Sequence, residues 1–177
     1  MKKMKLLLIG AAFSAVAFTS CSDDDNNGGI NNQVQIAGTY RLTEVNTEEA
    51  TDFNEDNTSN VNQMMESNCF IDSQVTFNAD NTFIYNIKNI LVDEAAGTSA
   101  CNSYTVGGIW ILQGGVGTSA LIDATYEAPN GQAITIRFNK EGDQLTQFTQ
   151  NGQYADIDEN GGAVYTSGSV ELIFERQ

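Results

Sequence analysis

The acidic sequence Asp156-Ile157-Asp158-Glu159-Asn160-Gly161 has the residue types and spacing of a calcium-binding loop. Asp156, Asp158 and Asn160 would supply the oxygen ligands that calcium prefers, and the glycine allows a sharp turn. The twelfth position, where a bidentate glutamate belongs, is Ser167. A solvated loop is therefore the simpler interpretation. Weak calcium binding with carboxylates from a second loop is the alternative hypothesis, and we expect no other cofactor.

The overall composition argues against catalysis and against nucleic-acid binding. The 177 residues include 23 acidic side chains, 8 basic side chains and no histidine, for a net charge of −15. A surface of this sign repels a phosphate backbone. The absence of histidine removes the commonest general base and the commonest zinc ligand. No serine or cysteine has a base beside it in the sequence, so we expect a protein that is not an enzyme.

The N-terminal residues combine the features of an export signal with a single cysteine. Three lysines among the first five residues precede an apolar run over residues 6–18, which is too short for a membrane span. The run ends at Phe18-Thr19-Ser20-Cys21 and is followed at once by Ser22-Asp23-Asp24-Asp25. A free thiol in such a polar segment would be exposed and reactive.

The sequence around Cys21 resembles the lipobox of bacterial lipoproteins, in which the cysteine thiol is acylated and the leader is cut before it. The resemblance implies a signal peptide over residues 1–20, Cys21 as the lipidated residue and an acidic flexible tether over residues 21–35. Two or more acyl chains such as palmitate anchor a protein stably. A secretory signal with an incidental cysteine is the alternative interpretation.

The acidic residues 23–25 look like the export tag that follows the acylated cysteine in surface lipoproteins of some Gram-negative bacteria. This likeness implies a lipid anchor in the outer membrane, with the protein facing the cell exterior. The alternative is a solvated acidic tether that carries no export signal.

Beyond residue 35, apolar residues recur at every second position, which is typical of half-buried strands. The predicted strands cover residues 37–46, 73–78, 82–89, 106–113, 119–127, 133–139, 143–149 and 169–176. One short helix is predicted over Asn60–Ser67, where Val61, Met64 and Met65 have helical spacing. The fold class is therefore all-β.

Short and long connections alternate along this series of strands. Short turns fall over residues 78–81, 114–118 and 139–142, and long links fall over residues 47–72, 90–105, 128–132 and 150–168. In an up-and-down barrel, alternate connections lie at alternate ends. The sequence thus predicts an eight-stranded antiparallel up-and-down barrel over residues 36–177. We call the end with the short turns the base and the other end the mouth; the N-terminal segment enters at the base, so the mouth should face away from the membrane.

Three segments of the predicted barrel resemble the lipocalin-like domains of small bacterial lipoproteins. They are Gly38-Thr39-Tyr40-Arg41-Leu42, the hairpin over residues 74–83, and Gly108-Ile109-Trp110-Ile111-Leu112. The resemblance implies a barrel that is filled by side chains or holds one small ligand. Tyr40 stands where classical lipocalins place a tryptophan, so the likeness implies the fold and not a particular ligand.

Two cysteines remain once Cys21 is assigned to the anchor. Exported proteins meet oxidising conditions, in which such pairs form disulfides. Cys69 precedes the second predicted strand and Cys101 precedes the fourth, so the antiparallel topology brings both to the same end of the barrel. We predict a disulfide that ties the 47–72 link to the 90–105 link and contributes about 3–4 kcal/mol.

The predicted mouth is acidic and carries aromatic residues suited to contact with a sugar or a peptide. These residues are Phe53, Tyr104, Tyr126, Tyr154 and Tyr165. The function that we expect is a lipid-anchored, surface-exposed, non-enzymatic binding module for a small neutral or cationic ligand. The alternative is an accessory subunit with a filled barrel that docks onto another envelope protein. An apolar void on the order of a few hundred Å³ at the mouth would favour the binding module.

Overall fold

The protein is described here from a computed structural model that covers residues 35–177. The predicted signal peptide, the tether up to residue 34 and Cys21 lie outside the described residues. Within residues 35–177, no helix has the length and apolarity that crossing a bilayer requires.

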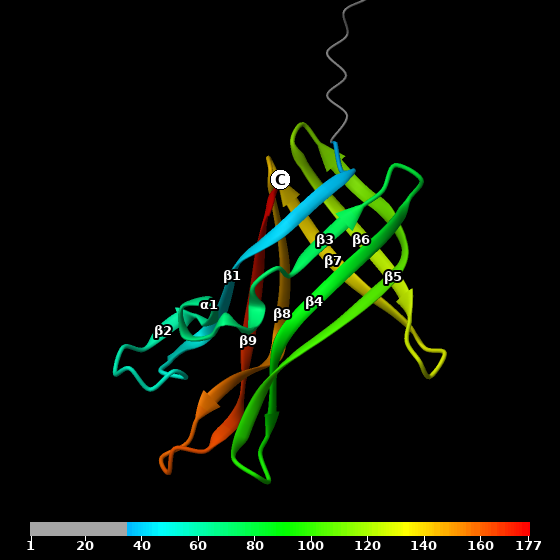
Figure 1. Ribbon diagram of the computed structural model, residues 1–177. Coiled ribbons are helices and arrows are strands. Elements are labelled where there is room, and N and C mark those ends of the chain that lie inside the picture. Colours follow the sequence, from blue (N-terminus) through cyan, green and yellow to red (C-terminus); the bar gives the residue numbers. More distant parts are fainter. Residues whose placement is uncertain (1–34) are drawn as a thin grey trace, which may run out of the picture. The chain divides into compact units, whose positions relative to one another are not determined.

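The described residues form a closed eight-stranded antiparallel barrel, which confirms the predicted fold class (Figure 1). The barrel strands are β1 (Gly38–Thr51), β3 (Gln74–Phe77), β4 (Thr82–Asp93), β5 (Thr98–Val116), β6 (Ser119–Glu127), β7 (Ala133–Glu141), β8 (Gln144–Ile157) and β9 (Ala163–Arg176). Each strand pairs with the next, and β1 pairs with β9 to close the barrel. A short strand β2 (Asn60–Asn62) pairs with the far half of β1 and leads into α1 (Gln63–Glu66) and the 3₁₀ turn η1 (Asn68–Phe70).

The base and the mouth lie at opposite ends of the barrel, as the alternation of connections predicts. Residues 78–81, 117–118 and 142–143 turn at the base, where the described chain also begins and ends. Residues 52–73, 94–97, 128–132 and 158–162 connect the strands at the mouth. The base is at the top of Figure 1, where β1 starts beside the C-terminus, and the hairpins β4–β5 and β8–β9 extend to the mouth below.

The short helix is confirmed in part, and two of the predicted long links are wrong. Residues 90–105 and 150–168 are mainly strand, so only four residues join β4 to β5 and five join β8 to β9. Residues 98–105 and 150–153 of these strands are mostly polar, so the period-two apolar signal is weak there, although Ile90, Val92 and Ala155 nearby are buried in the core. Of the predicted helix Asn60–Ser67, residues 60–62 are strand β2 and only α1 is helical.

Aromatic side chains fill the barrel interior nearer the base. The ring of Phe77 makes edge contacts with Tyr40, Trp110 and Phe138 at centroid distances of 6.0, 5.8 and 5.7 Å. Phe138 in turn packs edge-on against Phe174 at 6.2 Å. All of these rings are buried, and such T-shaped arrangements are favoured by the ring quadrupoles. This part of the barrel is a packed core rather than a ligand chamber.

Lys140 is an exception within this interior, because it is a buried cation without a carboxylate partner in the described chain. Its ammonium donates a hydrogen bond to the backbone carbonyl of Gly142. Burial lowers the pKa of Lys140 and the positive charge of Arg176 lowers it further, while the Asp143 carboxylate opposes this shift without reversing it. A base whose pKa is lowered by folding opposes folding wherever it is protonated in the unfolded chain.

We therefore expect Lys140→Met to raise the free energy of unfolding at pH 7. The gain should shrink as the pH approaches about 10.4, the ordinary pKa of lysine, because the side chain is then neutral in both states. Urea denaturation at pH 7 and pH 10 measures this difference. The matched control is Lys88→Met, since Lys88 is more exposed and pairs with Asp72 at 3.4 Å. An equal response of both variants would contradict the account of Lys140.

Candidate ligand cavity at the mouth

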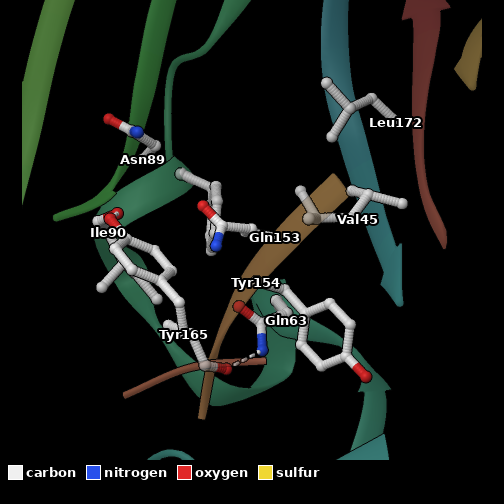
Figure 2. A pocket seen from close by; sticks show the side chains of 11 residues that line it. Val45, Gln63, Asn89, Ile90, Gln153, Tyr154, Tyr165 and Leu172 are labelled. Carbon is white, nitrogen blue, oxygen red and sulfur yellow. Dashed lines mark hydrogen bonds between the residues drawn. The ribbon is translucent and has the colours of Figure 1, made fainter. Parts of the chain in front are cut away.

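A cavity of about 310 Å³ lies at the mouth, beneath α1 and η1 and between strands β1, β4, β8 and β9 (Figure 2). Its lining residues are Val45, Gln63, Phe70, Asn89, Ile90, Gln153, Tyr154, Ala155, Tyr165, Val170 and Leu172. The lining combines aliphatic groups with the amides of three side chains and the rings of two tyrosines. None of these eleven side chains carries a formal charge at pH 7.

A β-bulge in β1 positions one residue of the cavity wall. The pairing of β1 with β9 shifts by one residue between Leu42 and Glu44. In a regular strand, residues 42 and 45 would face opposite sides. The extra residue lets both Leu42 and Val45 point inward, where both are buried. Leu42 thus joins the aromatic core and Val45 lines the cavity.

Gln63 of α1 covers the cavity and is held by two hydrogen bonds. Its side-chain amide donates to the Ala155 carbonyl at 2.7 Å and to the Thr51 hydroxyl at 3.0 Å, and the residue is 1% exposed. Asn62 caps α1 by accepting from the Met64 N–H, and the same carboxamide oxygen accepts from the Val45 N–H. The helical turn is therefore tied to both β1 and β8.

The disulfide predicted from the sequence fixes η1 over the same cavity. Cys69 and Cys101 are bonded, with their Cα atoms 4.9 Å apart. Cys101 lies within β5, paired with Ile90, and not in a link before the strand as predicted. Ser73 adds a second attachment, because its hydroxyl accepts from the Lys88 N–H and donates to the Lys88 carbonyl. Phe70 of η1 is thereby held in the cavity wall.

Tyr165 joins two sides of the mouth. Its hydroxyl accepts a hydrogen bond from the Val92 N–H at 3.1 Å and donates to the Ile90 carbonyl at 3.3 Å, so β9 is linked to β4. The tips of the two hairpins also meet, since the Ala163 N–H donates to the Gly97 carbonyl at 3.1 Å. These contacts narrow the mouth and leave the ring of Tyr165 against the cavity (Figure 2).

Tyr154 lines the cavity with its ring, but its hydroxyl is directed away from Gln63 (Figure 2). This hydroxyl is buried and has no hydrogen-bond partner among the described residues; the backbone of Glu49 approaches it without hydrogen-bonding geometry. Burial raises the pKa of Tyr154. An unpaired buried hydroxyl opposes folding.

The two tyrosines therefore give opposite expectations for the same substitution. Tyr165→Phe should lower the free energy of unfolding by about 1–2 kcal/mol, because it leaves the Val92 N–H without an acceptor. Tyr154→Phe should leave the free energy of unfolding unchanged or raise it, because this substitution removes a hydroxyl that has no hydrogen-bond partner among the described residues. Chemical denaturation of both variants measures the two effects. A Tyr154→Phe loss as large as that of Tyr165→Phe would contradict this description of the mouth.

Acidic side chains surround the mouth, and the segments that connect the strands there contain no lysine or arginine. Two strand residues, Arg41 and Lys88, form ion pairs with Asp72 of the 52–73 segment. The acidic residues of the mouth segments and adjoining strand ends are Glu48, Glu49, Asp52, Glu55, Asp56, Glu66, Asp72, Asp93, Glu94, Glu127, Asp156, Asp158 and Glu159. Some of these carboxylates accept hydrogen bonds from backbone N–H groups. Glu48 accepts from the Ser169 N–H and Glu94 accepts from the Tyr165 N–H. A negative rim around an uncharged cavity attracts cations and disfavours anions.

The calcium-like sequence forms the turn between β8 and β9. The Asp158 carboxylate accepts from the N–H groups of Asn160 and Gly162, both at 2.8 Å, and these bonds lower its pKa. Asp156 accepts from the Thr166 hydroxyl at 3.1 Å. Within residues 35–177, no three acidic or cysteine side chains gather in an arrangement suited to a metal ion. The sequence pattern thus serves a hairpin turn, and weak calcium binding stays a prediction.

The structure brings together only part of the predicted set of contact residues. Tyr154 and Tyr165 line the cavity, whereas Phe53 follows β1 and packs partly against the core. Tyr104 on β5 and Tyr126 on β6 do not line it. Contact of any of these residues with a ligand stays a prediction.

Sequence reasoning missed the polar lining residues Gln63, Asn89 and Gln153. Gln63 lies in the predicted helix and Gln153 in a predicted link, whereas Asn89 ends the predicted strand 82–89, where it has the pattern of an ordinary polar strand residue. Polar residues at the ends of otherwise alternating strands are the signal that could have identified them.

Residues 17–95 match a family described as "Domain of unknown function (DUF5004)". The matched part includes Cys21 and Cys69 and extends through β4. No curated protein and no solved structure matches the chain. Over fewer than half of its residues, the chain is therefore similar to a family for which no function is described.

Proposed function

We propose that the protein is a lipid-anchored, non-enzymatic binding module that takes a small uncharged or cationic molecule into the cavity at its mouth. The observation that carries the proposal is the cavity itself. Its volume of about 310 Å³ is at the lower end of the range for small-molecule sites, about 300–1,000 Å³. Its mix of aliphatic walls and side-chain amides resembles such sites in general.

The lining chemistry sets the class of ligand. The amides of Gln63, Asn89 and Gln153 provide both donors and acceptors, which suits hydroxyl or amide groups on the ligand. The acidic rim favours approach of a neutral or positively charged molecule over an anion. No pair of carboxylates faces the cavity among its lining residues, which supports binding rather than hydrolysis.

The anchor part of the proposal comes from the sequence around Cys21. Acylation of this residue would attach the protein to the outer membrane, with the barrel facing the cell exterior. The described chain begins at the base, so an anchor fourteen residues before Gln35 would leave the mouth on the far side of the barrel. A cavity placed there would be open to the medium.

The alternative function is an accessory subunit with a filled barrel that docks onto another envelope protein. The packed aromatic core near the base agrees with a filled barrel. The cavity at the mouth favours the binding module, because a docking subunit has no need of a cavity lined by both polar and apolar side chains.

Nuclear magnetic resonance tests the cavity directly through the side-chain amides of Gln63 and Gln153. The probes are D-glucose, choline and acetate, which are neutral, cationic and anionic. We expect a neutral or cationic probe to shift these amide signals and acetate to leave them in place. Ala155→Leu should abolish the shifts, because Ala155 lines the cavity and the larger side chain occupies it.

The matched control is Ala133→Leu, the same substitution at an exposed position of β7, which should preserve the shifts. Shifts that persist in Ala155→Leu would place binding elsewhere. The absence of any shift with sugars and quaternary ammonium compounds would contradict the ligand class.

A further inference from the structure

Four large apolar side chains on β5 are exposed near the base. Ile109, Ile111, Leu112 and Val116 are 60%, 53%, 49% and 86% exposed. They occupy the last part of β5, which continues through the turn at residues 117–118 into β6. We call these four residues the β5 surface. Ile111 and Leu112 line one groove and Val116 lines another together with Leu121, and exposed apolar groups gathered at one end of a domain mark an interaction site.

The β5 surface borders the point where the described chain begins. A groove of about 490 Å³ is lined by Ile111 and Leu112 on one side and by residues 35–37 on the other. The Arg176 guanidinium donates to the carbonyls of Gln35 and Ala37, which holds this entry segment in place. The fourteen residues from Cys21 to Gln35 span at most about 50 Å. An anchor at Cys21 would therefore hold the entry segment, and the β5 surface beside it, within about 50 Å of the bilayer.

Charge also distinguishes this end of the barrel. The tip of the β5–β6 hairpin is built from glycine, threonine and serine around Val116, and it carries no charged side chain over residues 112–120. The base as a whole contains Asp80, Glu141, Asp143 and Glu175 together with Arg176 and the buried Lys140. The acidic rim lies at the mouth. Such a distribution suits contact with a zwitterionic lipid surface better than with an anionic one.

We propose that the β5 surface rests on the lipid bilayer, with Val116 at the hairpin tip entering the headgroup region. The proposal builds on the lipid anchor of the proposed function, because an anchor that holds the β5 surface beside the membrane raises the occupancy of a contact that is measurable on its own. It gives the anchored barrel a fixed orientation, with the base on the lipid and the mouth exposed. A second copy of the chain is the other occupant that the test must separate.

The test uses the chain over residues 21–177 with Cys21→Ser, which contains the whole compact unit of residues 32–177 and carries no acyl group. Co-sedimentation with phosphatidylcholine vesicles then reports the β5 surface alone. We expect measurable partitioning that Val116→Asn reduces about fivefold or more, since transfer of an exposed valine side chain to lipid is lost. Leu91→Asn, at a residue 54% exposed near the mouth, is the matched control and should bind as the parent does.

Three results would overturn the proposal. They are an absence of vesicle binding by the parent chain, equal binding by Val116→Asn, and self-association in sedimentation velocity that Val116→Asn abolishes. The third result would assign the β5 surface to a second copy. Because the chain carries no anchor in this experiment, its outcome does not depend on whether Cys21 is acylated in the cell.

Discussion

Phe77→Ala is expected to lower the free energy of unfolding by about 3–5 kcal/mol, the largest effect of any single truncation proposed here. Phe77 is 1% exposed and contacts four aromatic rings, those of Tyr40, Phe83, Trp110 and Phe138. Truncation leaves a cavity that its neighbours, in strands fixed by barrel closure, fill only in part. Guanidinium denaturation followed by tryptophan fluorescence measures the loss, since Trp110 packs against the same ring.

The matched control is Phe148→Ala, which removes the same atoms from a strand residue that is 56% exposed. Its cost should stay near 1 kcal/mol or less, because little apolar area returns to water. Equal losses for the two variants would mean that the aromatic cluster is not the core of the barrel.

Removal of the disulfide by Cys69→Ser together with Cys101→Ser should lower the free energy of unfolding by about 3–4 kcal/mol. The bond joins residues separated by 32 positions, and in the chain-entropy treatment the loss reflects the freedom that the unfolded chain regains. Denaturation of the double variant measures this loss. Reduction of the parent protein should lower its stability by a similar amount.

The disulfide should also matter for the cavity, because it holds η1 and Phe70 in the wall. In the double variant we expect the amide signals of Gln63 to broaden or shift, while the core signals of Phe138 stay in place. Unchanged Gln63 signals would show that the hydrogen bonds to Ala155 and Thr51 position α1 without help from the disulfide. A loss of stability below about 1 kcal/mol would contradict the entropic role.

The base of the barrel could be predicted from the sequence because its order is local. Strand β6 spans residues 119–127, as predicted, and β7 alternates between exposed and buried positions from Arg137 to Glu141. The turn at residues 78–81 follows from Asn78-Ala79-Asp80-Asn81, in which Asp80 accepts from the Thr82 N–H and Asn81 adopts a positive φ of 65°. Each of these signals lies within a few residues of the structure that it specifies.

The mouth could be predicted only in outline because its contacts are non-local. Gln63 is held by the carbonyl of Ala155, which is 92 residues away in the sequence, and Tyr165 bonds to β4 across the barrel. Neither partner can be read from spacing along the chain. Tyr154 and Tyr165 were predicted as mouth residues from topology alone, which gave their end of the barrel but not the cavity that they share with Gln63.

The position of Cys101 within β5, and not in the predicted link, also results from non-local contacts. Residues 98–105 contain serine, threonine and asparagine with little apolar alternation, so they do not show the period of a half-buried strand. They form a strand because they pair with β4 along its whole length. The disulfide was still predictable, since the topology determined which end of the barrel each cysteine occupies.

The central claim is that the protein is an acylated barrel that holds a small molecule at its mouth. Native mass spectrometry of the protein extracted from its own membranes tests this claim most directly. The account predicts a chain that begins at Cys21, carries the added mass of acyl groups, and retains a small uncharged or cationic molecule that Ala155→Leu does not retain. An unmodified Cys21 thiol on the membrane-extracted protein, with no small molecule bound to either variant, would contradict it.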